Sequence, residues 1–226
     1  MTYNLCIDIG GTTFSFSIFI NKNKYFISKK YNIRKYNNVY FFLKDLVNYI
    51  EEKISQINIT EKLKIGIACP GPLNSKTGEI LNTPNLKFLQ NVNLVSELKK
   101  LLNYEIKIEN DANVYSLGAY NSLKIKSNVF IGITLGTGIG FGIIINGKLF
   151  KGSSGMAGEY EPSPLSNNLS WSELVGYKFF ENQSLKSFNK NYTPKELYNF
   201  VETSEKNKNE CSKIWEKYGY NIGLCL

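Results

Sequence analysis

The first part of the chain alternates apolar and polar residues in short runs, and longer helix-like patterns separate these runs. Alternating or β-branched runs bounded by Gly, Asn or Pro predict strands, and apolar positions three and four residues apart predict a helix. By this criterion 3–9, 14–20 and about 24–31 are strands, and a helix carries apolar positions from Val39 to Ile57. The remaining elements predicted in this part are a strand at 63–69, a Pro- and Gly-rich loop at 70–84, a helix at 94–102, a strand at 105–109 and a helix from 110 to about 121.

The second part of the chain begins with the same pattern, because strands are predicted at 129–135, 139–145 and 148–150. Helices are predicted from about Ser172, from Thr193-Pro194 with Glu196 completing a capping box, and from about Lys206. The β-β-β-α-β-α-β-α order of the first part predicts a mixed sheet with helices on its faces. By analogy, the closing strand-helix-strand-helix of the second part is missing. We therefore predict two α/β domains, 1–122 and 123–226, the second of them incomplete.

The composition of the chain excludes several classes of protein. With 226 residues, 42% hydrophobic and 14% aromatic, the chain is typical of a globular protein. No apolar stretch approaches the roughly 20 residues of a membrane helix, and no signal peptide is recognisable at the start, so we expect a cytoplasmic protein without a membrane partner. The absence of histidine excludes an imidazole base, and the four cysteines lack C-x-x-C spacing, so no zinc site is expected. We expect Cys6 and Cys69 to lie inside apolar strands.

The net charge of +8 raises nucleic-acid binding as an alternative. The lysines are spread thinly among Asn, Ile and Tyr, however, and only Lys29-Lys30 and the segment around Lys206 and Lys208 are locally dense. This distribution favours a solvated surface, and no specific nucleic-acid partner is predicted.

A glycine-rich turn between two strands occurs twice. The first copy contains Asp8, Gly10, Gly11, Thr12 and Thr13, and the second contains Gly136, Thr137 and Gly138. Glycine lets the backbone approach a phosphate closely, and threonine adds a hydroxyl donor. Two such hairpins facing each other across a cleft would hold a triphosphate, with the Asp8 carboxylate holding Mg²⁺ directly or through water. The alternative for Asp8 is an Asx turn in which it caps its own backbone.

Glu109-Asn110-Asp111 lies where a predicted strand ends and a helix begins. Ligands bind at the carboxyl ends of strands in an open α/β sheet, so Asp111 is a candidate general base and Asn110 a candidate substrate ligand. The alternative is that either residue simply caps the helix.

Two further loops have candidate binding groups. The turns at 69–73 and 82–86 present backbone and amide groups that suit a polyol. The alternative is that their Pro, Gly and Asn residues only form ordinary turns. Glu159 and Glu161, in a Gly- and Pro-flanked loop, could bind sugar hydroxyls or could be solvated charges.

These motifs together, in this order, resemble the ROK family of bacterial sugar kinases and repressors, within the actin-like ATPase fold. The resemblance rests on 8–12, 70–72, 82–85, 109–113, 135–140 and 158–159. It implies that Asp111 is the catalytic base and that Asp8 and both hairpins surround Mg-ATP. It also implies a sugar pocket lined by Gly71, Asn85, Asn110, Asp111 and Glu159, and it leaves a homodimer open because relatives commonly dimerise. Since no DNA-binding motif precedes Asp8, the kinase branch is favoured.

The chain departs from the family pattern in three places. Pro162 stands where the family has a sugar- and zinc-binding histidine, and 164–175 replaces its cysteine-rich zinc motif. Trp171-Ser172-Glu173 resembles the Trp-Glu pair of relatives without zinc, which places a second sugar-contacting glutamate at Ser172 or, with a slip of one residue, at Glu173. The family's adenine-binding segment would lie beyond Leu226.

We therefore predict an ATP- and Mg²⁺-dependent kinase that phosphorylates a hexose or N-acetylhexosamine, at O6, with Asp111 as the base. The alternative is a truncated, non-catalytic relative that binds sugar without turnover.

Overall fold

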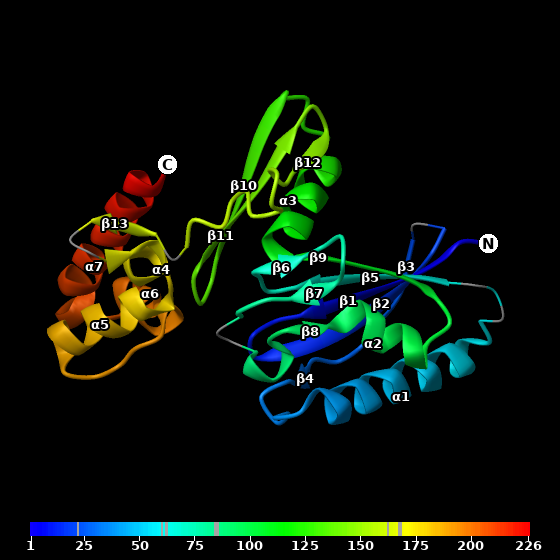
Figure 1. Cartoon of the computed structure of the whole chain (residues 1–226). Helices are drawn as coiled ribbons and strands as arrows, with labels where there is room; N and C mark the ends of the chain where they lie inside the picture. Colours follow the sequence, from blue (N-terminus) through cyan, green and yellow to red (C-terminus); the bar gives the residue numbers. More distant parts are fainter. Residues whose placement is uncertain (22, 60, 62, 84–85, 162, 167–168) are drawn as a thin grey trace.

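The computed structural model describes residues 1–226 except 22, 60, 62, 84–85, 162 and 167–168. A six-stranded sheet and a three-stranded sheet form the two main parts of the molecule, and helices pack on both (Figure 1). The elements before residue 123 are β1 (Tyr3–Ile9), β2 (Thr13–Ile20), β3 (Asn23–Ile27), β4 (Tyr31–Asn32), α1 (Val39–Ile57), β5 (Leu63–Cys69), β6 (Leu73–Asn74), β7 (Glu79–Ile80), η1 (Lys87–Leu89), β8 (Val92–Asn93), α2 (Leu94–Leu101), β9 (Glu105–Asn110) and α3 (Asp111–Ser122).

The larger sheet has the strand order β3-β2-β1-β5-β9, with β4 also paired to β2. β1 is antiparallel to β2 and parallel to β5, and β5 is parallel to β9, so the predicted mixed sheet is confirmed. Because β1, β5 and β9 run in the same direction, their carboxyl ends meet at one edge of the sheet. That edge carries Asp8, Cys69 and Asn110, each at or next to the end of its strand.

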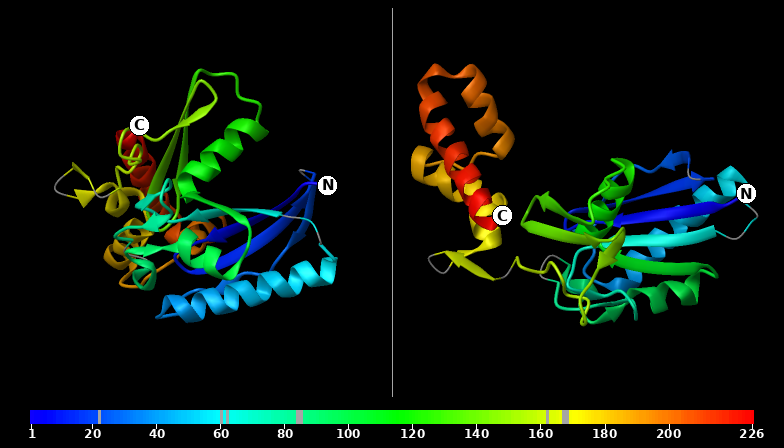
Figure 2. Two further views of the ribbon diagram at one scale, coloured as in Figure 1. Left: turned by 45° about the vertical axis from the view of Figure 1, so that its right-hand side comes forward. Right: turned by 90° about the horizontal axis from the view of Figure 1, so that it is seen from above.

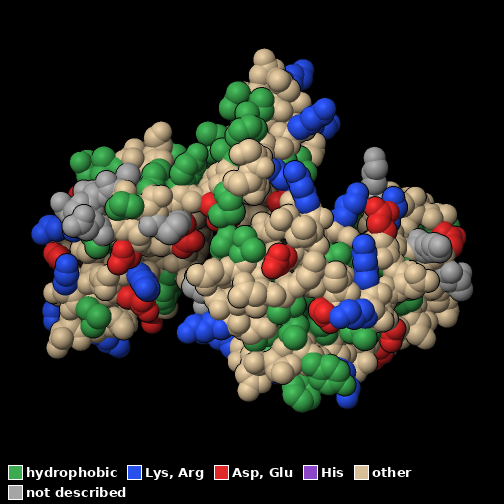
Figure 3. Space-filling model, in the orientation of Figure 1, with side chains coloured by type: hydrophobic (Ala, Val, Ile, Leu, Met, Phe, Trp, Pro, Cys, Tyr) green, Lys and Arg blue, Asp and Glu red, His purple; other side chains and the backbone are tan. Residues whose placement is uncertain are grey.

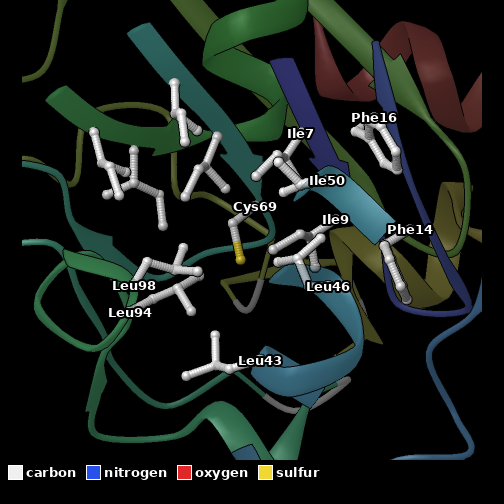
Figure 4. Close-up of a cluster of buried hydrophobic side chains, with 14 of the residues drawn as sticks. Ile7, Ile9, Phe14, Phe16, Leu43, Leu46, Ile50, Cys69, Leu94 and Leu98 are labelled. Carbon is white, nitrogen blue, oxygen red and sulfur yellow. The ribbon is translucent and has the colours of Figure 1, made fainter. Parts of the chain in front are cut away.

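One face of the larger sheet holds the main hydrophobic core (Figure 4). Alternate residues of β1 are buried, and their cross-strand partners on β2 and β5 are buried with them; for example, Ile7 pairs with Phe16 and with Ile67. Leu46 of α1 and Leu98 of α2 pack into the same cluster. Alternation in these strands follows from the period of two of a pleated sheet with one buried face.

The other face of this sheet is less covered and borders a groove. Both α1 and α2 cover the core face, whereas the opposite face borders a groove of about 1120 Å³ that is lined by apolar, small and charged side chains, for example Val114, Cys6 and Lys107. Cys6 and Cys69 both lie within strands, as expected. Cys69 is buried, whereas Cys6 is exposed because its side chain points to the groove. Alternating apolar residues in a strand indicate that one face of the sheet is buried. They do not show which elements cover the opposite face.

The smaller sheet has the order β10-β11-β12. The elements from residue 123 on are β10 (Val129–Leu135), β11 (Ile139–Ile145), β12 (Lys148–Phe150), β13 (Pro164–Ser166), β14 (Leu169–Ser170), α4 (Trp171–Val175), α5 (Tyr177–Phe188), α6 (Pro194–Thr203) and α7 (Glu205–Cys225). Helix α3 leaves the larger sheet and packs on one face of the smaller one, and the helices α5 to α7 form a separate group at the opposite end of the molecule from the N-terminus (Figures 1 and 2).

Glycines allow α3 to approach the smaller sheet closely. Gly132 and Gly142 pair across β10 and β11, and a Cβ atom on either would lie within 3 Å of the Cβ of Ser116 on α3. Ser116 is fully buried, and its Oγ donates a hydrogen bond to the carbonyl of Ala112 at 2.7 Å. The side-chain hydroxyl and the two glycines therefore set the distance between helix and sheet.

The opposite face of the smaller sheet is apolar and only partly covered. Near the β10–β11 turn, Ile139 and Phe141 pack against Val175 of α4 and Cys225 of α7. Farther along the strands, the side chains of Val129 and Ile131 are 56% and 53% exposed, and hydrophobic groups are visible at the surface there (Figure 3). None of the helices in the described ranges is both long and apolar enough to cross a membrane.

Candidate active site

The first glycine hairpin joins β1 to β2. The Gly10 amide donates to the carbonyl of Thr13 at 2.8 Å, which closes the turn. Asp8 comes two residues before Gly10 and lines the open groove together with Asp111. Among the described residues, no turn amide donates a hydrogen bond to the Asp8 carboxylate, so the observed geometry is not that of the Asx turn offered as an alternative.

The second glycine hairpin joins β10 to β11. The Gly136 amide donates to the carbonyl of Gly138 at 2.9 Å. The carbonyls of Gly136 and Thr137 in turn accept the backbone N–H of Tyr177, at 3.0 and 3.2 Å, where α5 begins. Gly176 fits at this junction because a Cβ there would lie 2.5 Å from the Thr137 carbonyl oxygen. The hairpin is therefore held in place by the helices that follow it.

Asn110 and Asp111 occupy different positions at the junction between β9 and α3, the first as the helix cap and the second within the helix. Asn110 caps α3, since its Oδ1 accepts the amides of Ala112 and Asn113 at 2.9 and 3.2 Å. Asp111 is the first residue of the helix, and its Oδ1 accepts the Ala112 amide at 2.8 Å. Burial raises the pKa of the Asp111 carboxyl, and the negative charges of Asp8 and Glu161 raise it further.

Glu159 joins this junction from the other part of the chain. The Nδ2 of Asn110 donates to Glu159 Oε1 at 3.0 Å. A Cβ at Gly71 would lie 2.7 Å from both of these atoms, so only glycine leaves room for the bond. Burial raises the pKa of the Glu159 carboxyl as well, with further contributions from Asp111 and Glu161.

A cavity of about 280 Å³ lies between the two glycine hairpins and the β9–α3 junction. Its volume is close to the lower end of small-molecule pockets and suits a ligand the size of a single sugar ring. The residues predicted from sequence that line it are Gly11, Gly71, Asn110, Asp111, Gly136, Thr137, Gly138 and Glu159. Of the other predicted residues, Gly10, Thr12 and Thr13 belong to the first hairpin without lining the cavity, Asp8 faces the groove, and Asn85 lies outside the described residues.

A sequence profile of the ROK family matches residues 4–166, a stretch that holds both glycine hairpins and the β9–α3 junction. The chain belongs to the ROK family. It is 34% identical over 159 residues to an N-acetyl-D-glucosamine kinase of Histophilus somni, covering 67% of this chain and 49% of the relative. A xylose repressor of Caldicellulosiruptor bescii is 39% identical over 120 residues, which are 52% of this chain and 30% of the repressor.

Solved structures of the same family share the fold. A ROK family glucokinase from Streptomyces griseus, in complex with glucose and AMPPNP, superposes with a TM-score of 0.74 at 19% identity, covering 98% of this chain and 77% of that one. The predicted actin-like α/β fold is thus confirmed for the part that this chain represents. The chain spans about half the length of the curated relatives that it matches.

The places where this ROK chain departs from the family pattern can now be located. Pro162, at the histidine position, lies outside the described residues. Ser172 Oγ donates a hydrogen bond to the Glu161 carboxylate, which lines the cavity. Glu173 instead accepts the amide and hydroxyl of Ser170 at 2.9 and 2.8 Å, completing the capping box of α4. These backbone and hydroxyl bonds lower the pKa of Glu173. Of the two positions considered for a second sugar ligand, Ser172 is therefore nearer the cavity.

The acidic groups of the site are compatible with Mg²⁺. Asp8 and Asp111 both line the groove beside the first hairpin, and Mg²⁺ is usually held by one or two carboxylates together with phosphate oxygens. In the part of the chain that the structure describes, no group of three or more Cys, Asp or Glu side chains is arranged to hold a metal ion by itself. The donor set thus fits a cation that arrives with a phosphate group.

Two features of the site were not anticipated. Trp171, Tyr160 and Phe141 form an aromatic group beside the cavity, with ring centroids 5.5–6.0 Å apart. Lys151, directly after β12, pairs with Glu109 on β9. A local sequence pattern has no signal for either contact, because the partners come from different elements.

Proposed function

We propose that this ROK chain transfers the γ-phosphate of Mg-ATP to a hydroxyl of a hexose or N-acetylhexosamine, at O6, with Asp111 as general base. The main supporting observation is the convergence of Asp111, Asn110 and Glu159 with both glycine hairpins around one cavity. The names of the relatives, an N-acetyl-D-glucosamine kinase and a glucokinase crystallised with glucose and AMPPNP, agree with this proposal.

In this mechanism the sugar lies against the bonded pair of Asn110 and Glu159. The Glu159 carboxylate accepts hydrogen bonds from ring hydroxyls, and the second N–H of the Asn110 amide donates one. Asp111 accepts the proton of the attacking hydroxyl as the oxygen bonds to phosphorus and the bond to the leaving ADP oxygen breaks. The raised pKa of Asp111 makes it a stronger base than an ordinary aspartate.

The two glycine hairpins would hold the triphosphate through turn amides other than those of Gly10 and Gly136, which donate within their own turns. Asp8 would hold Mg²⁺ together with phosphate oxygens, and the ion would supply positive charge beside the transferred group.

The test is ADP release from Mg-ATP with a panel of hexoses and N-acetylhexosamines, followed by ³¹P NMR to identify the phosphorylated oxygen. Asp111→Asn keeps the acceptor for the Ala112 amide but cannot take a proton, so turnover should fall by at least about 100-fold. Glu202→Gln, the same chemical change on the exposed face of α6, is the matched control and should keep wild-type turnover. Absence of sugar-dependent ADP release from folded wild-type protein would refute the proposal.

A second candidate function is sugar binding without turnover. It is favoured by the similarity to a xylose repressor. Trp171 next to the cavity gives a direct binding signal through its fluorescence, with Trp215→Phe removing the other tryptophan. A saturable fluorescence change without ADP release would support this candidate over the kinase.

A further inference from the structure

Lys151 links the two sheets at the point where the candidate catalytic residues begin. It follows β12 of the smaller sheet, and its Nζ forms an ion pair with the Glu109 carboxylate of β9. The same Nζ donates to the hydroxyl of Ser75 at 2.9 Å. The contact therefore joins a residue that follows the smaller sheet to β9 of the larger sheet and to the β6–β7 turn.

The pair is better shielded than the other ion pairs among the described residues. The side chains of Lys151 and Glu109 are 36% and 20% exposed, whereas the pair between Lys64 and Glu105, also on the larger sheet, is 66% and 50% exposed. Fully exposed pairs contribute little to stability, but a shielded charge that loses its partner is costly. Position and shielding together suggest a role beyond surface charge.

The other oxygen of Glu109 holds the start of α3. Its Oε1 accepts the Nδ2 of Asn113 and the backbone amide of Asn110, both at 3.1 Å. One carboxylate oxygen thus fixes the first turn of the helix that begins with Asp111, and the other contacts Lys151. Glu109 therefore connects Lys151 to the backbone amide of Asn110 and to the side chain of Asn113.

The segment that follows β12 contacts the β9–α3 junction at two points. Lys151 pairs with Glu109, and eight residues later Glu159 accepts a hydrogen bond from Asn110. Adjacent residues of β9 are therefore held by the two ends of one segment, which begins where the smaller sheet ends. That sheet also carries the second glycine hairpin.

We propose that Lys151 is a positioning residue that sets the placement of Asn110 and Asp111 relative to the second glycine hairpin. This inference rests on the proposed function, since it assigns Lys151 a part in aligning Asp111 with the phosphate. Small errors of alignment reduce the rate of the chemical step more than the affinity for substrate, because both substrates still bind.

The experiment compares Lys151→Met with Lys148→Met, a matched change on the exposed end of β12. For Lys151→Met we expect kcat to fall about tenfold while the sugar KM changes by less than about threefold. Lys151→Arg should recover most of kcat, because a guanidinium can still pair with the Glu109 carboxylate. Glu109→Gln should resemble Lys151→Met, and the double variant should be little worse than either.

A second measurement does not depend on turnover. Asn110 caps the amides of Ala112 and Asn113, so Lys151→Met should speed their hydrogen exchange about tenfold, while Lys148→Met leaves it unchanged. If wild-type protein releases no ADP, the proposed function fails and the exchange rates still decide the role of Lys151. Equal exchange in the two variants, or a kcat for Lys151→Met equal to that of Lys148→Met in an active enzyme, would overturn the inference.

Discussion

Replacement of Gly142 by alanine should destabilise the protein, because this glycine lies directly under α3. A Cβ there would lie 2.5 Å from the Cβ of Ser116 and 2.8 Å from the carbonyl oxygen of Ala112, and it would also meet Ser116 Oγ. Ordinary contacts lie at 3.4–4 Å, so helix and sheet must separate by about 1 Å. The Ala112 oxygen is backbone and cannot rotate away.

Overpacking of this kind costs about 1–3 kcal/mol. In a protein of this size, ~2 kcal/mol corresponds to a fall in melting temperature of about 4–8 °C. The assay is thermal and urea unfolding followed by circular dichroism, with unchanged far-UV spectra as evidence that the variant folds. Gly118→Ala is the matched control: Gly118 is inside α3 with no atom within 4 Å of an added Cβ, so the same change there should stabilise by about 1 kcal/mol.

A double variant tests the cause of the effect. Ser116→Gly removes the atoms that the new methyl group meets first, so it should recover at least ~1 kcal/mol of the loss in Gly142→Ala, beyond the additive expectation. If Gly142→Ala melts at or above the wild-type temperature while Gly118→Ala behaves as expected, the close approach of α3 to the smaller sheet is not a constraint on stability and this reasoning is wrong.

Three further predictions concern the site and the helices. As the pH falls, kcat/KM should be lost with a midpoint above the usual pKa range of aspartate, because the pKa of Asp111 is raised and its protonated form cannot act as a base. A pH profile of kcat/KM at several sugar concentrations checks this, and a midpoint near the ordinary aspartate value would contradict it. Gly71→Ala should raise the sugar KM or Kd by about tenfold, because the new methyl group would meet both Asn110 Nδ2 and Glu159 Oε1; Gly66→Ala, on β5 with no atom near the added Cβ, is the control. Thr193→Ala should cost about 1 kcal/mol, measured by urea unfolding, because Thr193 Oγ1 accepts the Glu196 amide in the capping box of α6.

Local patterns predicted much of the fold. The bounds of β1, α1, β5 and the three strands of the smaller sheet agree with the sequence prediction, because alternation and helical spacing are strong in these segments. The cap at Asn110 and the capping box at Thr193 were also visible as short motifs. The Ser170-x-x-Glu173 spacing carried the same signal. It could have shown in advance that Glu173 is engaged at the start of α4.

Contacts between distant segments were not predictable from sequence. Lys151 lies 42 residues from Glu109 and 76 from Ser75, and no short motif connects them. The groove beside the larger sheet was not predicted for a similar reason, since the residues of β1 specify which side is apolar but not which elements cover each side. The residues of the cavity could be proposed because they lie at strand ends, where topology brings them together.

Asp111 and Glu159 are half-buried carboxyls with raised pKa values, and they line the same cavity of a chain that has no histidine. Because the chain has no imidazole to titrate, these two carboxyls, whose pKa values are raised, are the natural sources of any proton exchanged on sugar binding. Calorimetric titration with sugar alone, in buffers of different ionisation enthalpy, would therefore measure the number of protons that the site exchanges for each sugar bound. When bound sugar displaces water from Asp111, the Asp111 carboxyl should take up a fraction of a proton from the buffer.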